Sequence, residues 1–198
     1  MKDTTHLSIN GFLKIYDPVS NDVFFNGNNA IHYENMSLVL ARRLISNSGY
    51  IYKMVFGNGG TTVDPTGIIT YLSPNNVGSN VSLYNQTYEK SIDLLSSQNL
   101  DSLRNYTQVR HVTGTTYSDI FITCLLDYGE PSNQMAFDNS TNNNSDYVFD
   151  ELGLKSYDDE ISKQLLLTHV IFHPVQKALN RLIQIDYTIR IQSLTGGV

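Results

Sequence analysis

The sequence predicts a mainly β protein, an antiparallel β-sandwich with one amphipathic helix near the N-terminus. Two segments near the C-terminus carry this prediction. In residues 183–192 an isoleucine or tyrosine alternates with a polar residue at every step, as in a strand with one face in a core and the other in solvent. Residues 165–172 are apolar almost throughout, which indicates a strand covered on both faces.

The composition favours a single protein-binding domain. The 198 residues are most simply one β-sandwich-like domain spanning residues 1–198, long enough to bury a substantial core. Charged residues make up 16% of the chain, against about 25% in typical soluble domains, and the net charge is -6. Lysine and arginine form no cluster, so binding to nucleic acid through phosphate neutralisation is not expected. A polar, weakly charged surface suits packing against other protein copies.

The single cysteine, Cys124, lies inside an apolar run and has no partner for a disulfide within the chain. A buried thiol is the favoured interpretation, and a reactive nucleophile is the alternative. The first residues lack an apolar segment of signal-peptide length, and no window approaches about 18 consecutive apolar residues. We therefore expect the chain to be made and kept in the cytoplasm, with no membrane-spanning segment.

In chain order, the first predicted element is a hairpin over residues 12–25, where a turn-forming segment separates two β-rich segments. Residues 30–45 are predicted as a helix, because their apolar residues recur three and four positions apart. Asn29 is the predicted N-cap of this helix. Arg42 and Arg43 would lie at its negatively polarised C-terminal end.

A strand at residues 50–56 is followed by a glycine-rich loop at residues 57–67. A glycine loop after a strand can bind phosphate, but the lysine of a P-loop and the G-x-G-x-x-G spacing are missing, and no helical pattern follows. We favour a tight turn in which glycine permits positive φ or close backbone approach, and we expect the loop to be irregular and functional. A short strand at residues 68–72 and a loop at residues 73–80 follow.

The segment after residue 81 fits either a helix or a strand around Tyr88 and Ile92, and both alternatives stay open. Residues 106–112 and 117–126 are predicted to pair as strands across a glycine-containing turn. Residues 138–146 form an asparagine-rich, low-complexity patch, which we expect to be a solvent-exposed loop.

Two groups of side chains suggest catalysis or metal binding. His169 and His173 have the i, i+4 spacing of a helical zinc site, but in a strand they would lie about 13 Å apart, too far to share one metal ion. His111 and Asp119 suggest two members of a triad, but Ser118 lacks the context of a nucleophile elbow. Packed or surface histidines are the favoured interpretation.

Two acidic segments complete the candidates. Asp158, Asp159 and Glu160 are better explained as a solvated loop or helix start than as an acid–base pair. Glu151 and Gly153 suggest a tight turn after a strand, in which the carboxylate accepts backbone amides and the glycine has positive φ. We therefore expect no catalytic residues, no metal site and no cofactor.

Several motifs follow one another along residues 29–192. A helix ending in a small polar turn, NAIHYENMSLVLARRLISNSG, is followed by a strand entering a glycine loop, YIYKMVFGNGG, and by LYNQTY. Near the end come FDELGL, an apolar strand, a Pro-x-x-Lys turn from Pro174 to Lys177, and the alternating strand. In this order the chain resembles virion structural proteins of tailed bacteriophages, particularly uncharacterised structural proteins and the N-terminal attachment modules of tail-collar fibres.

The resemblance implies a non-enzymatic virion component at the neck, collar, tail or baseplate, acting as a ring component or an anchor for fibres. Its implied partners are other copies of itself and neighbouring phage structural proteins, with no nucleic acid, membrane or small-molecule substrate. No long repetitive shaft follows the alternating strand, so we expect an adaptor or decoration subunit rather than a complete fibre. The alternative is a glycan- or receptor-binding module whose tyrosine-rich loops, within residues 71–88, contact the ligand.

Within this interpretation, the C-terminal strands would form the scaffold. The partner contacts would come from the glycine loop and the asparagine-rich loop, because both offer backbone groups that a partner can satisfy. The residues concerned are Gly57, Asn58, Gly59, Gly60, Asp64, Asn139, Asn142, Asn143 and Asn144.

Overall fold

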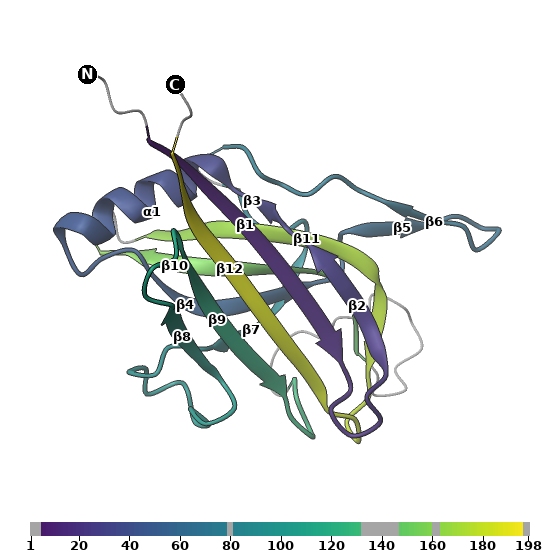
Figure 1. The fold of residues 1–198 in the computed structure, drawn as a ribbon. Coiled ribbons are helices and arrows are strands. Elements are labelled where there is room, and N and C mark those ends of the chain that lie inside the picture. The colour runs from purple at the N-terminus through teal and green to yellow at the C-terminus, as the bar shows by residue number, and fades with distance from the viewer. Residues whose placement is uncertain (1–4, 79–80, 132–146, 160–162, 196–198) are drawn as a thin grey trace.

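The computed structural model describes residues 5–78, 81–131, 147–159 and 163–195. These residues form two five-stranded antiparallel sheets packed as a sandwich, a separate two-stranded sheet and one helix (Figure 1). In chain order the elements are β1 (Thr5–Tyr16), β2 (Val23–Asn28), β3 (Ala30–Ile31), α1 (Tyr33–Ile45), β4 (Tyr50–Gly57), β5 (Thr61–Val63), β6 (Ile69–Tyr71), β7 (Gln86–Ser91), β8 (Tyr106–His111), β9 (Tyr117–Leu126), β10 (Tyr147–Asp158), β11 (Lys163–Lys177) and β12 (Ile183–Thr195). The predicted fold class is confirmed.

The two C-terminal strands lie inside the two sheets, as their patterns predicted. The first sheet has the order β2-β1-β12-β9-β8, and the second has the order β3-β11-β10-β4-β7. In β12 the apolar residues of the alternating pattern, Ile183 to Ile189, are buried against the second sheet. In β11 residues 165–170 are buried on both faces. Leu165 and Leu167 belong to the main core, which also includes Met36 and Val39 of α1. Leu166 packs on Leu83 and Val55 in a separate cluster.

The N-terminal hairpin is also confirmed, since β1 pairs with β2 across a turn at residues 17–22. The Asp17 carboxylate accepts the backbone amides of Val19 at 2.8 Å and Ser20 at 3.2 Å, which holds the turn. β1 begins earlier than predicted because it pairs with β12 along its whole length. The predicted pairing of β8 with β9 is confirmed as well.

The start of the helix differs from the prediction. Residues Ala30–Ile31 form β3 and pair with β11, so α1 begins only at Tyr33. The N-cap is His32, whose Nδ1 accepts the amide of Asn35 at 3.2 Å, and the prediction of Asn29 was wrong. The pairing with β11 keeps the chain extended for longer than the apolar spacing alone suggests.

The rest of the helix follows the prediction. Arg42 and Arg43 lie in the last turn of α1, where they complement the helix dipole. The inner face packs against β11 and buries Met36 and Val39. In the part of the chain that the structure describes, no helix has both the length and the apolar character needed to cross a membrane.

The FDELGL segment is not a turn. It lies within β10, where Gly153 pairs with Val55 on one side and His169 on the other, and Gly153 does not have positive φ. Glycine is required there for a different reason, because a Cβ would lie 2.6 Å from the carbonyl oxygen of Thr168 on the neighbouring strand. The prediction that Glu151 accepts backbone amides is confirmed below.

The predicted Pro-x-x-Lys turn was also wrong. β11 continues through His173 and Pro174 and ends at Lys177, and the chain reverses at residues 178–182. The register between β10 and β11 shifts at this point, opposite Asp150, and proline is tolerated at such irregularities.

The ambiguous segment contains a strand. β7 forms one edge of the second sheet and pairs with β4, and Tyr88 and Ile92 are buried in the core. Residues 92–105 then form a long loop that leads to β8. The helical alternative fails because sheet pairing with β4 determines the backbone conformation of this segment.

Cys124 lies on β9 and is buried in the core. Burial raises the pKa of its thiol to about 12, so the thiol stays protonated at neutral pH. The interpretation as a buried thiol is therefore confirmed.

A run of aromatic rings joins the two sheets. Phe25 of the first sheet packs on Phe172 of the second, with ring centroids 5.5 Å apart. Phe172 packs edge-on against Phe149 at 5.6 Å, and Phe149 packs edge-on against Phe56 at 5.5 Å. Tilted and edge-on pairs of this kind add about 0.5–1.5 kcal/mol each beyond their buried area. Phe149 is the centre of this run and is completely buried.

Phe149→Ala should therefore lower the free energy of unfolding by about 3–5 kcal/mol, because it leaves a cavity between the sheets. Urea denaturation followed by circular dichroism measures the loss. The matched control is Phe12→Ala, where the same ring is 50% exposed on β1 and the expected loss is below about 1 kcal/mol. Equal losses in the two variants would contradict the assignment of Phe149 to the centre of the core.

Candidate functional site

A hairpin stands out from the body of the sandwich. β5 and β6 pair with each other and with no other described strand, and in Figure 1 they extend to the right, away from both large sheets. We call residues 61–71 the hairpin arm. An isolated two-stranded hairpin is only marginally stable in water, so the arm needs support from its turn and from its base.

The turn of the arm is strongly specified by its sequence. The Asp64 carboxylate accepts the amides of Thr66 at 2.8 Å and Ile68 at 2.9 Å, and Pro65 fixes the backbone between them. Gly67 has φ of 86°, which suits glycine. The second half of the predicted glycine loop is therefore a regular hairpin, and the tight-turn interpretation is confirmed there.

The base of the arm is held by two adjacent carboxylates of β10. The amides of Gly60 and Thr61 donate to Asp150 at 2.9 and 2.8 Å, and the amide of Gly59 donates to Glu151 at 3.1 Å. The Thr61 hydroxyl also donates to Asp150. In a phosphate-binding loop, backbone amides converge on a bound anion. Here the amides converge on carboxylates of the protein itself, those of Asp150 and Glu151.

The glycines at the base allow close backbone approach. A Cβ at Gly57 would lie 2.4 Å from the Asn85 carbonyl oxygen and from Oε1 of Glu151. A Cβ at Gly59 would lie 2.7 Å from the Cβ of Tyr84. The carboxylates reach the loop amides only because no side chain stands between them.

Glu151 also fixes a second segment. Its carboxylate accepts the amides of Tyr84 at 2.9 Å and Asn85 at 2.8 Å, and it contacts His169 Nε2 at 2.9 Å. The amide of Asn75 donates to His169 Nδ1 at 2.8 Å, so Nδ1 carries no proton and Nε2 donates to Glu151. Glu151 and His169 are both completely buried.

The surroundings move the pKa values of the two carboxyls in opposite directions. Burial acts to raise the pKa of Glu151, but hydrogen bonds from His169, Asn85 and Tyr84 outweigh it, and the pKa lies below its ordinary value. For Asp150 burial dominates over the hydrogen bonds from the arm, and its pKa is raised. Glu151 is therefore the more firmly ionised of the two.

The structure places the predicted contact residues differently from what the sequence suggested. Gly57 and Gly60 are buried, and the amides of Gly59 and Gly60 are bonded within the chain, so the expected exposed backbone is not found there. Asp64 is exposed near the tip of the arm. Asn139, Asn142, Asn143 and Asn144 lie outside the described residues. A contact role for any of these residues stays a prediction.

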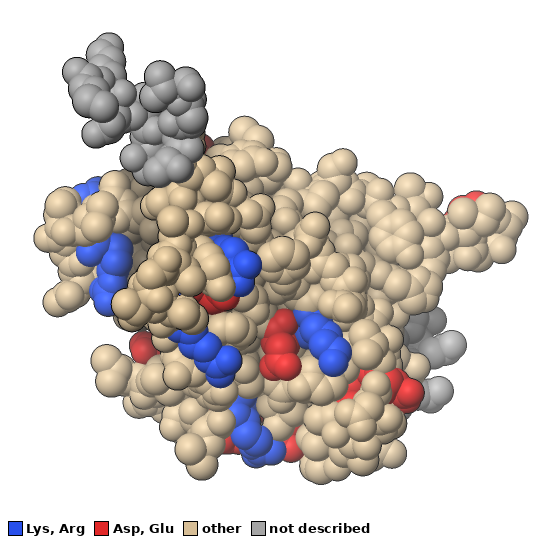
Figure 2. Space-filling view, in the orientation of Figure 1, with Lys and Arg blue, Asp and Glu red and all other residues tan. Residues whose placement is uncertain are grey.

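The exposed apolar surface of the arm was missed by the sequence analysis. Val63 is 62% exposed, Ile68 is 63% exposed and Tyr71 is half exposed. β-branched and aromatic residues on both sides of the turn are a strand signal, but they do not show whether any sheet covers the strand. In Figure 2 the arm is tan apart from red atoms towards its tip, in agreement with Asp64 as its acidic residue.

The histidines considered as metal ligands or catalytic residues do not come together in one site. His169 and His173 lie on a strand as predicted, with His169 bound to Glu151 and His173 near the Tyr71 hydroxyl at 3.2 Å. Among the described residues, no three His, Cys, Asp or Glu side chains are arranged to hold a metal ion. His111 contacts the Ser118 hydroxyl at 3.0 Å.

The acidic candidates bind basic side chains. Asp119 forms two hydrogen bonds of 2.8 Å to Arg190 and does not join His111. Asp158 is buried at the end of β10, where Arg42 lies 3.7 Å away, so the expected solvated loop was wrong for this residue. Glu160 lies outside the described residues.

Two tyrosines of the segment 71–88 use their hydroxyl groups within the chain. Tyr71 contacts His173, and Tyr84 donates to the carbonyl of Ser73 at 2.7 Å. Tyr88 is buried. The tyrosine-rich segment that the glycan-binding alternative invokes is thus partly used for internal packing.

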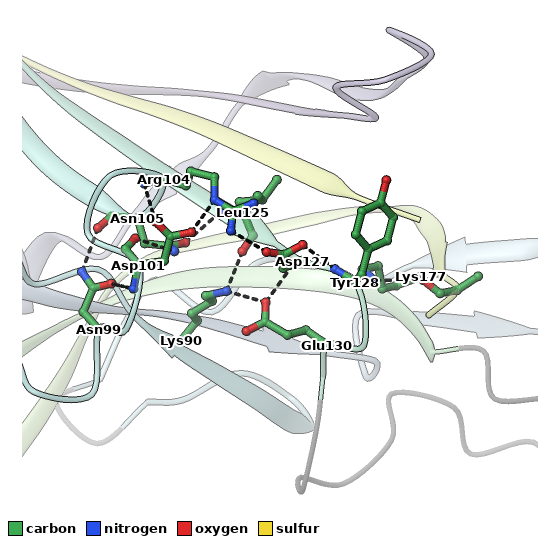
Figure 3. Close-up of polar contacts among 11 residues, drawn as sticks. Lys90, Asn99, Asp101, Arg104, Asn105, Leu125, Asp127, Tyr128, Glu130 and Lys177 are labelled. Carbon is green, nitrogen blue, oxygen red and sulfur yellow. Dashed lines mark hydrogen bonds and ion pairs between the residues drawn. The ribbon is translucent and has the colours of Figure 1, made fainter. Parts of the chain in front are cut away.

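A second polar cluster lies away from the arm and fixes residues 92–105, which we call the leucine loop (Figure 3). Arg104 binds Asp127 at 2.6 Å and also Asp101 within the loop. The Asn105 side chain accepts the amide of Leu125 at 2.9 Å, which ties the loop to the end of β9. Polar groups of the loop therefore point towards the body.

Two lysines, one partly and one completely buried, extend this cluster between the two sheets. Lys90 of β7 donates to the carbonyl of Leu125 at 2.6 Å and pairs with Glu130 (Figure 3). Lys177 is completely buried, and its ammonium donates to the carbonyl of Ala178 at 2.9 Å. Burial lowers the pKa of Lys177 to about 8, although Glu130 acts to raise it. The cluster joins β7 and β11 of one sheet to β9 of the other.

The leucine loop presents apolar side chains to solvent. Leu95 and Leu100 are each 94% exposed and Leu103 is 88% exposed. Leu100 and Leu103 are three residues apart, as on one face of a helix, so their spacing alone does not reveal that they are exposed. Contiguous exposed apolar residues on a soluble protein mark interaction surfaces.

Comparison of the chain with protein-family models, with curated proteins and with solved structures finds no match in any of the three.

Replacing Glu151 with Gln should loosen the base of the arm. The substitution keeps the shape of the side chain but places an amide group against backbone donors, which should cost about 2–3 kcal/mol of unfolding free energy. Hydrogen exchange of residues 57–72 and 84–85 should accelerate. Glu34→Gln on the exposed side of α1 is the matched control, with an expected loss below about 1 kcal/mol. Unchanged exchange at the arm would contradict the anchoring role.

The lowered pKa of Glu151 predicts a pH dependence. Its folded pKa lies below the unfolded value of about 4.3, so its stabilising contribution is fully present above that value and is lost as the pH falls through the folded pKa. The difference in unfolding free energy between wild type and Glu151→Gln should be constant from about pH 7 to about pH 5 and shrink on further acidification. Urea titrations at each pH measure this difference, and a difference that grows in acid would refute the assignment.

Proposed function

We propose that this protein is a non-enzymatic structural subunit of a tailed phage particle, which assembles with copies of itself and with neighbouring proteins at the neck, collar, tail or baseplate. The observation that carries the proposal is the hairpin arm. It is anchored by buried carboxylates at its base and specified by Asp64 and Gly67 at its turn, and it exposes the apolar side chains of Val63, Ile68 and Tyr71 to solvent.

Two further features support the proposal. The ordered motifs along residues 29–192 resemble phage virion proteins, and the sandwich supplies a rigid body on which to mount the arm. The face in view in Figure 2 carries scattered blue and red groups, several of them side by side, and no broad field of one sign. Such a surface suits wet, repeated contacts between proteins.

The proposal is tested by the composition of purified particles. Mass spectrometry of gradient-purified virions of the source phage should detect the chain at many copies per particle, and a cryo-EM map should contain its sandwich in a symmetric array. A replication protein of the same phage serves as the control and should be depleted. If the chain is depleted from particles to the same degree as the control, the proposed function is wrong.

A further inference from the structure

The molecule has two exposed apolar surfaces that lie far apart. The hairpin arm exposes Val63, Ile68 and Tyr71, and the leucine loop exposes Leu100 and Leu103. In Figure 1 the arm extends to the right, whereas the loop between β7 and β8 lies at the lower left, on the other side of the sandwich. The arm of one molecule therefore does not cover the leucine loop of the same molecule.

The leucine loop borders a groove. An open groove of about 500 Å³ runs between the loop and the outer face of the first sheet. Leu103 and Tyr106 line one side, Phe121 lies on β9, and Thr188 lies on β12. The groove therefore has apolar and aromatic walls with polar groups between them, and its volume suits a compact segment of another molecule.

The strand next to the groove has a free edge. Among the described strands, β8 pairs with β9 on one side only, and it ends the first sheet. The arm has free edges as well, since within the described part of the chain β5 and β6 pair only with each other. Unpaired backbone donors and acceptors on both surfaces allow the arm to add to the sheet beside β8.

Each of the two surfaces carries a charged side chain that is not paired with an opposite charge of the described chain. Asp64 is the only charged side chain of the arm, and its exposed carboxylate makes no ion pair with a described residue. Arg110 lines the groove, stacks on Phe121 with 4.2 Å between its guanidinium carbon and the ring centroid, and makes no ion pair with the rest of the described chain. Arg104 and Asp186 also line the groove, but both are already hydrogen-bonded within the chain. Arg110 is therefore the side chain of the groove that can pair with Asp64 of another molecule.

From these observations we propose that the hairpin arm of one copy docks into the groove beside the leucine loop of a second copy. A second copy is the occupant because each chain carries both halves of the contact, an arm with the exposed carboxylate of Asp64 and, on the opposite side of the body, a groove in which Arg110 has no ion pair with a described residue. The inference rests on the proposed structural role and names the partner of the arm. Because the two contacting surfaces differ, the contact is head to tail and generates a ring or a filament, not a two-fold dimer.

The test uses the purified full-length chain and two double variants. Val63→Lys with Ile68→Lys blocks the arm, and Leu100→Lys with Leu103→Lys blocks the loop, since lysine on exposed edges opposes association. Light scattering after size-exclusion chromatography should find wild type larger than a dimer and each variant monomeric. An equimolar mixture of the two variants should form a one-to-one dimer and nothing larger, because one intact arm and one intact groove remain.

The matched control is Val19→Lys with Val23→Lys, which adds the same charges at exposed positions of the N-terminal hairpin. It should assemble as wild type does. Circular dichroism of every variant checks that the sandwich is retained. A monomeric wild type, or a mixture of the two variants that stays monomeric, overturns the inference.

A crosslink provides a second measurement that does not depend on the lysine variants. Thr62→Cys on the arm combined with Gln108→Cys on β8 leaves Asp64 and Arg110 in place and changes two exposed residues. This chain should form intermolecular disulfides under mild oxidation and give a ladder on a non-reducing gel, because Cys124 is buried and does not compete. Val19→Cys with Gln108→Cys is the control and should give no ladder. Equal ladders from both chains would refute the docking geometry.

The two proposals fail separately. Virions that contain the chain, together with a chain that is monomeric in solution, would remove the docking inference and leave the structural role intact. A chain that assembles head to tail but is absent from virions would remove the structural role and leave the contact between copies.

Discussion

Asp150 and Glu151 are two adjacent buried carboxylates of the second sheet. They determine how the glycine loop and residues 84–85 are placed against that sheet. Removing a carboxylate from water costs several kcal/mol unless its oxygens find donors in the protein. Here the donors are amides of the glycine loop, amides of residues 84–85 and the ring of His169. These hydrogen bonds also satisfy backbone amides of the glycine loop and of residues 84–85, which lie outside the strands. The carboxylates therefore fix where the arm leaves the body and how the following segment covers the sheet.

The arm and the leucine loop are built in the same way although they share no sequence motif. In each, polar groups bind inward, to Asp150 and Glu151 at the arm and to Asp127 and Leu125 at the loop, while apolar side chains face solvent. A segment that is already ordered loses little conformational entropy when a partner binds it. The inward hydrogen bonds of the arm and the leucine loop keep both segments ordered. Their apolar side chains are therefore held in fixed positions outside the core.

Several groups that often mark active sites have structural partners in this protein. Glu151 and His169 hold a covering segment, the amides of the glycine loop bind internal carboxylates, and the buried Lys177 belongs to a cluster that joins the two sheets. Ser118 and His111 are close, but Asp119 binds Arg190 instead of completing a triad. In this protein these groups hold the fold together, and the exposed surfaces of the arm and the leucine loop are the features on which we base the proposed contact between copies.

The sequence by itself determined the fold class, most strands, the N-terminal hairpin and the burial of Cys124, because alternation and turn residues act over a few neighbouring positions. Tertiary structure decided what those patterns could not show. Pairing with β11 moved the helix N-cap to His32, and packing against Thr168 placed Gly153 inside a strand. The partners of Glu151 are distant in sequence, so no local pattern predicts them. The exposure of the arm and the leucine loop likewise depends on whether another part of the fold packs against them. Only the tertiary structure determines this.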